Sequence, residues 1–282
     1  MKKALIMGLG FIVGIGLLVL WWNQYGTTVL DVSETRLSWL TAALTCAAIA
    51  LWFQLIRTAH LVDKATAHQL RSAVFLSHGM NVLLPSLLGD AYEVTAIAKQ
   101  TQTQTRIILL KLIHRFGTTL SALALLMAVA LFSSTPNLGF LVLTAGLTLP
   151  FVIDRALPRI SRWVHVDPIA PLGRSQTAFH TTLAVFQHTI SAMGVFFLGV
   201  AVNDAVDPTA AAAMLSTADL VTYLPVPLGG VGVNHWGVTA ICDMLGRIPV
   251  ALVALNHAMV VLIGGVSIAI GLATRREAMH NG

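Results

Sequence analysis

Two basic side chains inside an apolar stretch are the residues of this sequence best suited to chemistry. Lys111 and Arg115 lie four residues apart in the apolar run 107–132, so they share one face of a helix. An ammonium and a guanidinium fork at this spacing could hold one phosphate between them. In the alternative interpretation, Lys111 extends to the membrane surface and Arg115 pairs with a carboxylate.

Polar side chains also flank an interruption at Pro85. Asp90 and Glu93 follow it and could neutralise Arg115, receive a proton, or cap the helix that restarts there. Asn81, one turn before Pro85, could satisfy a backbone carbonyl freed by the interruption or contact a ligand. All three are candidates for a site that also contains Arg115.

A second interruption, over residues 225–234, is the most distinctive segment. Its glycines make the backbone approachable, and the N–H groups of a helix restarting there would point at a bound group. An anionic headgroup fits that environment, and a tight helix crossing is the alternative. Asp219 precedes the interruption and is a candidate charge partner. The candidates of this segment are Gly229, Gly230, Gly232, Asn234 and Asp219.

Histidine and amide side chains in the other apolar runs receive no specific role. A histidine in a membrane helix forms hydrogen bonds between helices as readily as it carries protons. This group contains His114, His180, Gln187, His188, Asn256 and His257.

The composition indicates an integral membrane protein. Of 282 residues, 56% are hydrophobic and 10% are charged, whereas a soluble domain has about 25% charged residues. Cys46 and Cys242 are too few for a cysteine metal site, and the sequence has no metal, nucleophile or P-loop motif. We therefore expect no cofactor and no enzymatic activity. The formal charge of +5 is attributed to basic cytoplasmic loops, and no nucleic-acid partner is expected.

Six apolar stretches approach the roughly 20 residues with which a helix crosses a bilayer. Two further stretches, Ala73–Ala98 and Ala210–Leu245, contain the interruptions, which a lipid-facing span does not tolerate. The segment Asp154–Gln176 is predicted to be an interfacial loop. The predicted class is all-α and integral to the membrane, with two broken re-entrant segments and six full transmembrane helices. These helices are Ala4–Trp22, Leu37–Ile56, Ile107–Phe132, Leu138–Ile153, Thr177–Val202 and Val250–Ala273.

The two interrupted stretches resemble one another. Both contain Leu-Pro-x-x-Leu-Gly, at residues 84–89 and 224–229, followed by Val-Thr-Ala-Ile and then by Arg-Ile at the start of a long helix. The halves 1–134 and 135–282 therefore each hold three full spans and one broken segment. Because each half would cross the membrane an odd number of times, the second half has the opposite orientation in the membrane. The sequence thus predicts one membrane domain, 1–282, built as an inverted repeat with its site at the broken segments.

Basic residues set the predicted orientation. With the N-terminus in the cytoplasm, the outer segments hold only Arg36 and Arg247, as the positive-inside rule demands. Both termini are then cytoplasmic, and the predicted location is a bacterial cytoplasmic (inner) membrane. The basic residues of the cytoplasmic segments are Lys2, Lys3, Arg57, Lys64, Arg71, Lys99, Arg106, Arg155, Arg159, Arg162, Arg174, Arg275 and Arg276.

The two interruptions also carry motifs of a known family. Residues 81–90 read Asn-x-x-x-Pro-x-x-x-Gly-Asp, and residues 225–232 read Pro-x-Pro-x-Gly-Gly-x-Gly. They resemble segments of the flippase-like membrane domain of lysylphosphatidylglycerol synthases and their stand-alone relatives. In its order of elements, the resemblance covers essentially the whole chain. It implies translocation of an aminoacylated phospholipid or a polyprenyl-phosphate-linked sugar.

The chain departs from the family pattern at three places. Leu228 is inserted before the glycine pair, and Asn234 stands where members commonly carry an acidic residue. Residues 114–118 read His-Arg-Phe-Gly-Thr where members commonly show Glu-Arg-x-x-Asp. Only Arg115 is retained, so the resemblance still implies phosphate binding but not the family's charge network.

These observations predict a lipid flippase-like transporter. Arg115 and Lys111 would hold the phosphate, and Asp90, Glu93 and Asn234 would line a polar cavity while the tails stay in lipid. Three alternatives stay open: a membrane-embedded glycosyl or acyl transferase with an acidic general base, a transporter of a small soluble anion, and a non-transporting assembly partner of a lipid- or glycan-modifying synthase.

Overall fold

The computed structural model describes residues 12–13, 15–25, 36–62, 65–84, 88–163, 165–166, 170–202, 206–222, 232–244 and 250–280. Throughout these residues the chain is helical with short connections, and they contain no β-strand. The predicted all-helical class is confirmed.

Long apolar helices dominate the part of the chain that the structure describes. Five of them have the length and hydropathy to cross a membrane, which confirms five of the six predicted spans and indicates a multi-pass membrane protein. Of the first predicted span, Ala4–Trp22, residues 15–22 belong to a helix over 15–25, and most of the rest lies outside the described residues. The five are α2 (Leu37–Leu61), α5 (Thr105–Phe132), α6 (Pro136–Trp163), α7 (Arg174–Ala201) and α11 (Val250–His280).

Helix α6 is longer than predicted. The sequence places its end at Ile153 and a loop over Asp154–Gln176, but the helix continues through Pro150 and Pro158 to Trp163. Pro150 lacks the N–H that would bond the carbonyl of Gly146. Ser121 of α5 donates its hydroxyl to that carbonyl at 2.5 Å, so the neighbouring helix replaces the lost bond. The prediction of a loop from Asp154 is therefore wrong as far as Trp163.

Each interrupted stretch forms two shorter helices. The first contains α3 (Ala67–Leu83) and α4 (Leu88–Thr101), and the second contains α8 (Pro208–Thr222) and α10 (Val233–Met244). Ser77 bonds Glu93 and Asn81 bonds Asp90, so α3 and α4 run antiparallel as a helical hairpin. Helix α10 likewise packs against α8. Residues 85–87 and 223–231, between the paired helices, lie outside the described residues.

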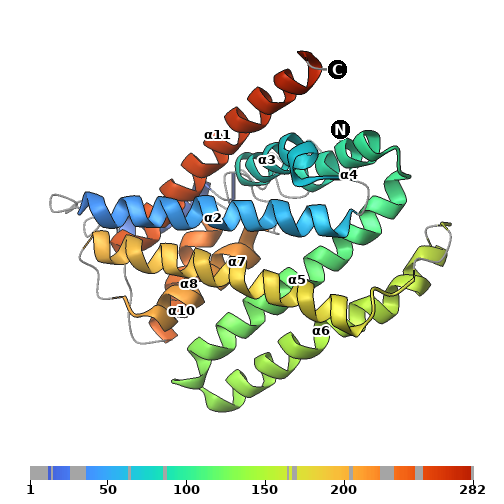
Figure 1. The fold of residues 1–282 in the computed structure, drawn as a ribbon. Helices are drawn as coiled ribbons and strands as arrows, with labels where there is room; N and C mark the ends of the chain where they lie inside the picture. The colour runs from blue at the N-terminus through green and yellow to red at the C-terminus, as the bar shows by residue number, and fades with distance from the viewer. Residues whose placement is uncertain are drawn as a thin grey trace.

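The long helices pack in pairs with one another and with the hairpins (Figure 1). Helix α2 lies along α7, α5 packs on α6, and α3 packs on α11. Helix α5 also crosses α7 and contacts α8. Two separate apolar clusters result. One joins α2, α3, α4 and α5, and the other joins α7, α8, α10 and α11 with Trp21 and with Ala43 of α2.

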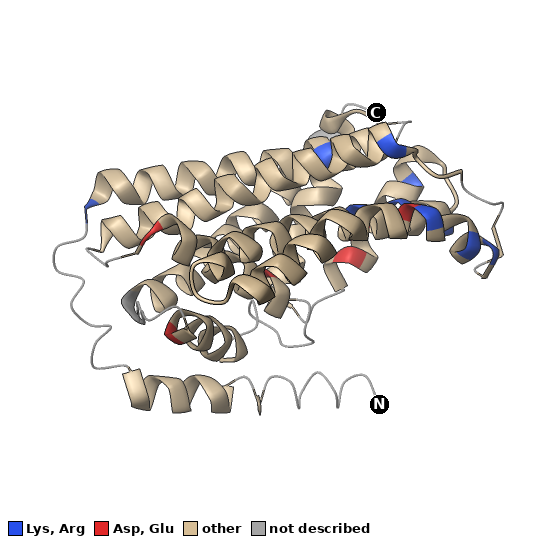
Figure 2. Ribbon diagram, turned by 90° about the horizontal axis from the view of Figure 1, so that it is seen from below, with Lys and Arg blue, Asp and Glu red and all other residues tan. Residues whose placement is uncertain are grey.

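Basic side chains gather toward one end of the bundle, the end at which α11 finishes (Figure 2). The backbone N–H of Arg36, at the start of α2, bonds the carbonyl of Ala201 at the end of α7, so these termini meet at one end. At another contact, Arg106 of α5 donates to the carbonyl of His165, just after α6. The ends of neighbouring helices therefore alternate as they do in an antiparallel bundle.

Candidate functional site

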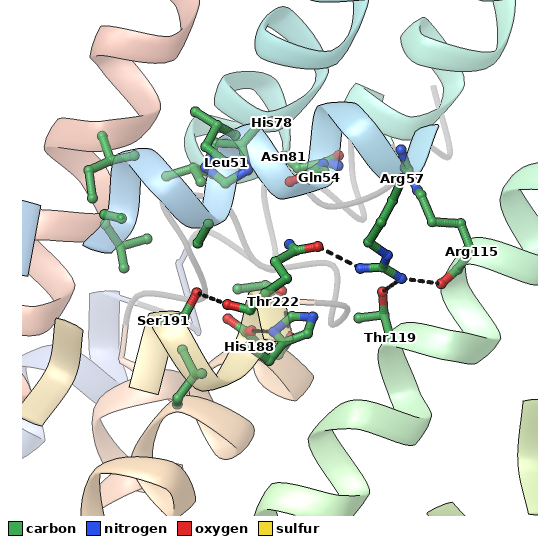
Figure 3. Close-up of a pocket in the computed structure, with 18 of the residues that line it drawn as sticks. Leu51, Gln54, Arg57, His78, Asn81, Arg115, Thr119, His188, Ser191 and Thr222 are labelled. Carbon is green, nitrogen blue, oxygen red and sulfur yellow. Dashed lines mark hydrogen bonds and ion pairs between the residues drawn. The ribbon is translucent and has the colours of Figure 1, made fainter. Parts of the chain in front are cut away.

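A cavity of about 720 Å³ lies between the helices, with walls from α2, α3, α4, α5, α7, α8 and α11 (Figure 3). Both hairpins contribute to it. Its wall on α2 is apolar from Ala43 to Leu51, and charged and amide side chains line other parts of it, including Gln54 and Arg57 of α2. The polar lining residues are Gln54, Arg57, His78, Asn81, Asp90, Arg115, Thr119, Gln187, His188, Ser191, Asp219, Thr222 and Asn256.

Arg115 forms the central ion pair of the site. Its two terminal nitrogens donate to the two carboxylate oxygens of Glu93 at 2.5 and 2.8 Å, and one of them also donates to Thr58 at 2.6 Å. Glu93 is 0% exposed and accepts a further bond from Ser77 at 2.9 Å. A bidentate pair with this burial is strong because solvent does not screen it. It joins α2, α3, α4 and α5 at one point.

Arg57 also lies in this region, although the sequence analysis assigned it to a cytoplasmic segment. The predicted helix end at Ile56 is too early, because α2 continues to Leu61 and includes Arg57. The guanidinium of Arg57 donates to Gln187 at 2.6 Å, to Thr118 at 2.9 Å and to Thr119 at 3.1 Å. These bonds let a cation that is only 1% exposed remain in the bundle.

Asn81 and Asp90 connect the two helices of the first hairpin. The amide nitrogen of Asn81 donates to the carboxylate of Asp90 at 2.9 Å, and the amide oxygen accepts from the backbone N–H of Asp90 at 3.2 Å. Asn81 thus accepts a hydrogen bond from one of the unpaired backbone N–H groups in the first turn of α4. Gly89 sits at the same contact, where a Cβ would overlap the carbonyl of Ser77 and the side chain of Asn81. Asp90 lies 4.0 Å from Arg115.

Across the cavity, Asp219 of α8 pairs with His188 of α7. The Nδ1 atom of His188 lies 3.2 Å from a carboxylate oxygen of Asp219. His188 is buried, yet its Nε2 atom has no hydrogen-bond partner among the described residues. Both ring nitrogens of His188 are buried, so the imidazole contributes to the wall of the cavity chiefly through its contact with Asp219.

Four of the predicted site residues, Asn81, Asp90, Arg115 and Asp219, line the cavity together, and Glu93 lies directly behind Arg115. Among the described residues, Lys111, Asn234 and Gly232 do not line it, and Gly232 precedes α10 with φ +77. Gly229 and Gly230 lie outside the described residues.

Other lining residues were not assigned a site role by the sequence analysis. The signal that could have found two of them is a repeated dipeptide. Phe53-Gln54 in α2 and Phe186-Gln187 in α7 lie in the two helices that pair along their length, and both glutamines line the cavity. The residues of this group are Gln54, Arg57, His78, Gln187, His188 and Asn256.

Two histidine pairs lie elsewhere between helices. The rings of His114 and His180 have centroids 5.8 Å apart, and those of His235 and His257 are 4.7 Å apart. Across the part of the chain that the structure describes, no group of three His, Cys, Asp or Glu residues could hold a metal ion. Of the two carboxylates that could act as a general base, Glu93 has both oxygens bonded to Arg115, whereas Asp90 lines the cavity.

Comparison of the chain with protein-family models, with curated proteins and with solved structures finds no match. The resemblance to the flippase-like domain therefore stays a prediction from motifs, and the cavity carries the functional argument.

Proposed function

We propose that this chain is a lipid flippase-like transporter that moves a lipid headgroup across a bacterial cytoplasmic membrane. One observation carries the proposal: a cavity lined by charges and amides lies inside a bundle of apolar, span-length helices. Charged groups at membrane depth are costly and usually mark a substrate pathway. The volume, about 720 Å³, is within the range of small-molecule sites. It suits a headgroup whose tails stay in lipid.

An inverted repeat is part of this proposal, and the helix pairing supports it. If the halves are exchanged, α3 corresponds to α8, α4 to α10, and α5 to α11. The contact of α3 with α11 then becomes the contact of α8 with α5, and both exist. The contacts α4 with α5 and α10 with α11 correspond in the same way. Helices α2 and α7 correspond to one another and pair across the proposed axis.

Equivalent sequence positions also meet in the cavity. Counted from Arg106 and from Arg247, Arg115 and Asn256 are each nine residues further along, and both line the cavity. Gln54 and Gln187 form a second such pair. A site built from equivalent positions of two inverted halves suits alternating access, in which the halves tilt in opposite directions around a fixed site. In this proposal the hairpins re-enter from opposite faces.

The basic end of the bundle faces the cytoplasm in this proposal, in accord with the positive-inside rule. Ser134, in the turn between α5 and α6, would then face outward, and Trp163 at the end of α6 would face inward. In a background lacking Cys46 and Cys242, a membrane-impermeant maleimide should label Ser134→Cys in intact cells but Trp163→Cys only after lysis. The reverse pattern would invert the proposed orientation.

The function is tested by blocking the cavity. Ala47 lines it, and the next residue on α2, Ala48, is exposed on the outside of the bundle. Purified protein in liposomes should move tail-labelled lipids from leaflet to leaflet, measured as loss of fluorescence to a membrane-impermeant quencher. Ala47→Trp should reduce the rate at least tenfold, whereas Ala48→Trp should leave it unchanged. Equal rates for the two variants and for protein-free liposomes would remove the transport proposal.

A further inference from the structure

The charged side chains that line the cavity are unequally exposed. Asp90 and Asp219 are 35% and 34% exposed, whereas Arg115 is 11% exposed and Arg57 is 1% exposed. The carboxylates come from the two hairpins, α4 and α8, so a bound group meets an acidic side chain from each half. The surface offered to that group is therefore more acidic than the residue list alone suggests.

The arginine donors are directed at the protein. The guanidinium fork of Arg115, which would suit a phosphate, is already matched to the two oxygens of Glu93. Arg57 directs its terminal nitrogens to Gln187, Thr118 and Thr119. A phosphate entering this site would have to displace those partners and would meet Asp90 and Asp219 with like charge.

The lining of the cavity also contains neutral groups that both donate and accept. These are the amides of Gln54 and Asn256 and the hydroxyls of Ser191 and Thr222. Amides and hydroxyls match the paired donors and acceptors of alcohol groups. The apolar wall of α2 and the ring of Phe116 suit the C–H face of a sugar.

We propose that the cavity binds an uncharged, hydroxyl-rich headgroup, a sugar, whose hydroxyls donate to Asp90 and Asp219. This inference rests on the proposed lipid transport and names its substrate class. A carboxylate is a strong acceptor for a hydroxyl and repels an anion, so the same two residues provide affinity and selectivity. A glycosyl diacylglycerol presents this chemistry, and so does the sugar of a polyprenyl-phosphate-linked lipid if its phosphate stays outside the cavity.

The test measures transport of four tail-labelled lipids in separate proteoliposomes. These are glucosyl diacylglycerol, polyprenyl-phosphoryl glucose, phosphatidylglycerol and lysyl-phosphatidylglycerol. At least one glucosyl lipid should move about tenfold faster than phosphatidylglycerol, since a charge-assisted hydrogen bond is worth roughly that factor. The faster of the two glucosyl lipids identifies the source of the sugar.

Variants of one acidic residue in the cavity and one outside it complete the test. Asp219→Asn should slow the glucosyl lipid about tenfold and should narrow its advantage over phosphatidylglycerol. Asp243 lies at an exposed position of α10, so Asp243→Asn should change neither the transport rate of the glucosyl lipid nor that of phosphatidylglycerol. Asp90→Asn repeats the measurement from the other hairpin.

Each other outcome overturns a defined claim. Faster transport of phosphatidylglycerol would overturn the sugar inference and leave lipid transport intact. Faster transport of lysyl-phosphatidylglycerol would mean that the two carboxylates bind an ammonium. If none of the four lipids moves faster than in protein-free liposomes, the proposed function itself fails.

Discussion

The two hairpins hold their polar side chains in different ways. In α3–α4, Asp90 and Glu93 both lie beside Arg115 of α5, and the three side chains have neutral partners on α2 and α3. In α8–α10, Asp219 pairs with His188 and keeps about a third of its surface toward the cavity. Helix α10 is held chiefly by apolar packing against α8 and Trp21.

This difference suggests that the two hairpins have different roles at the site. A saturated hydrogen-bond network in a low-dielectric interior is strong and has one arrangement. Asp219 is about a third exposed and has one neighbouring histidine, so its carboxylate can exchange partners when a ligand arrives. We interpret the first hairpin as the fixed frame of the site and the second as the side that responds to the bound group.

The strongest test of this comparison removes the central cation. Arg115→Ala leaves the buried carboxylate of Glu93 uncompensated, and the free energy of unfolding should fall by about 3–5 kcal/mol. The measurement is chemical unfolding in detergent. The double variant Arg115→Met with Glu93→Gln should be clearly more stable than Arg115→Ala, because no charge is left unpaired. Transport by that double variant separates a structural role of Arg115 from phosphate binding. Equal stability of wild type and Arg115→Ala would end the fixed-frame interpretation.

The same small change in each hairpin sharpens the contrast. Gly89→Ala pushes a methyl group into the backbone of α3 and should destabilise the protein by about 1–3 kcal/mol. In the second hairpin, a Cβ on Gly237 would only touch Thr217 and Val221 at 3.4 Å, so Gly237→Ala should be neutral or slightly stabilising. Thermal unfolding of both variants gives the comparison. Gly265→Ala, where nothing lies within 4 Å of the added methyl, is the control.

Gln54 and Gln187, the glutamines of the repeated Phe-Gln dipeptide, provide a third comparison. Gln187 accepts from the buried guanidinium of Arg57 at 2.6 Å, so Gln187→Leu leaves a charged donor unmatched and should cost about 1–3 kcal/mol. The amide of Gln54 faces the cavity instead. Gln54→Leu should therefore reduce transport of a hydroxyl-rich lipid with a smaller change in unfolding temperature. Equal destabilisation by both variants would contradict these different roles.

The smallest expected effect concerns the attachment of residues 15–25 to the second hairpin. The indole of Trp21 donates to Thr239 of α10 at 2.9 Å. Trp21→Phe removes that bond and should lower stability by about 1 kcal/mol, read as a shift in unfolding temperature. Trp22→Phe changes an exposed neighbour and should have no measurable effect.

Much of the fold could be predicted because lipid imposes simple rules on sequence. Span-length apolar runs have to form helices in which every backbone group is bonded, so α2, α5, α7 and α11 appear close to their predicted positions. The interruption at Pro85 ends α3, as predicted. Pro150 did not end α6, because Ser121 on a neighbouring helix supplies the missing bond, and that depends on packing.

The sequence predicted which residue types form the site better than it predicted which of them pair with one another. The pairing of Arg115 with a carboxylate was one of two interpretations, and Glu93 is that carboxylate. Arg57 was misplaced because its charge suggested a helix end, whereas Gln187, 130 residues away, makes its burial possible. Lys111, on the same helix face as Arg115 by spacing, does not line the cavity among the described residues.

The sequence by itself indicated a multi-pass helical membrane protein and the two interrupted stretches, because hydropathy, proline and glycine act locally along the chain. Only the tertiary structure decided which charges are neutralised within the protein and which face the cavity. The physical reason is that a charge at membrane depth is stabilised by partners from other helices, and the distance along the chain between such partners carries no signal of its own.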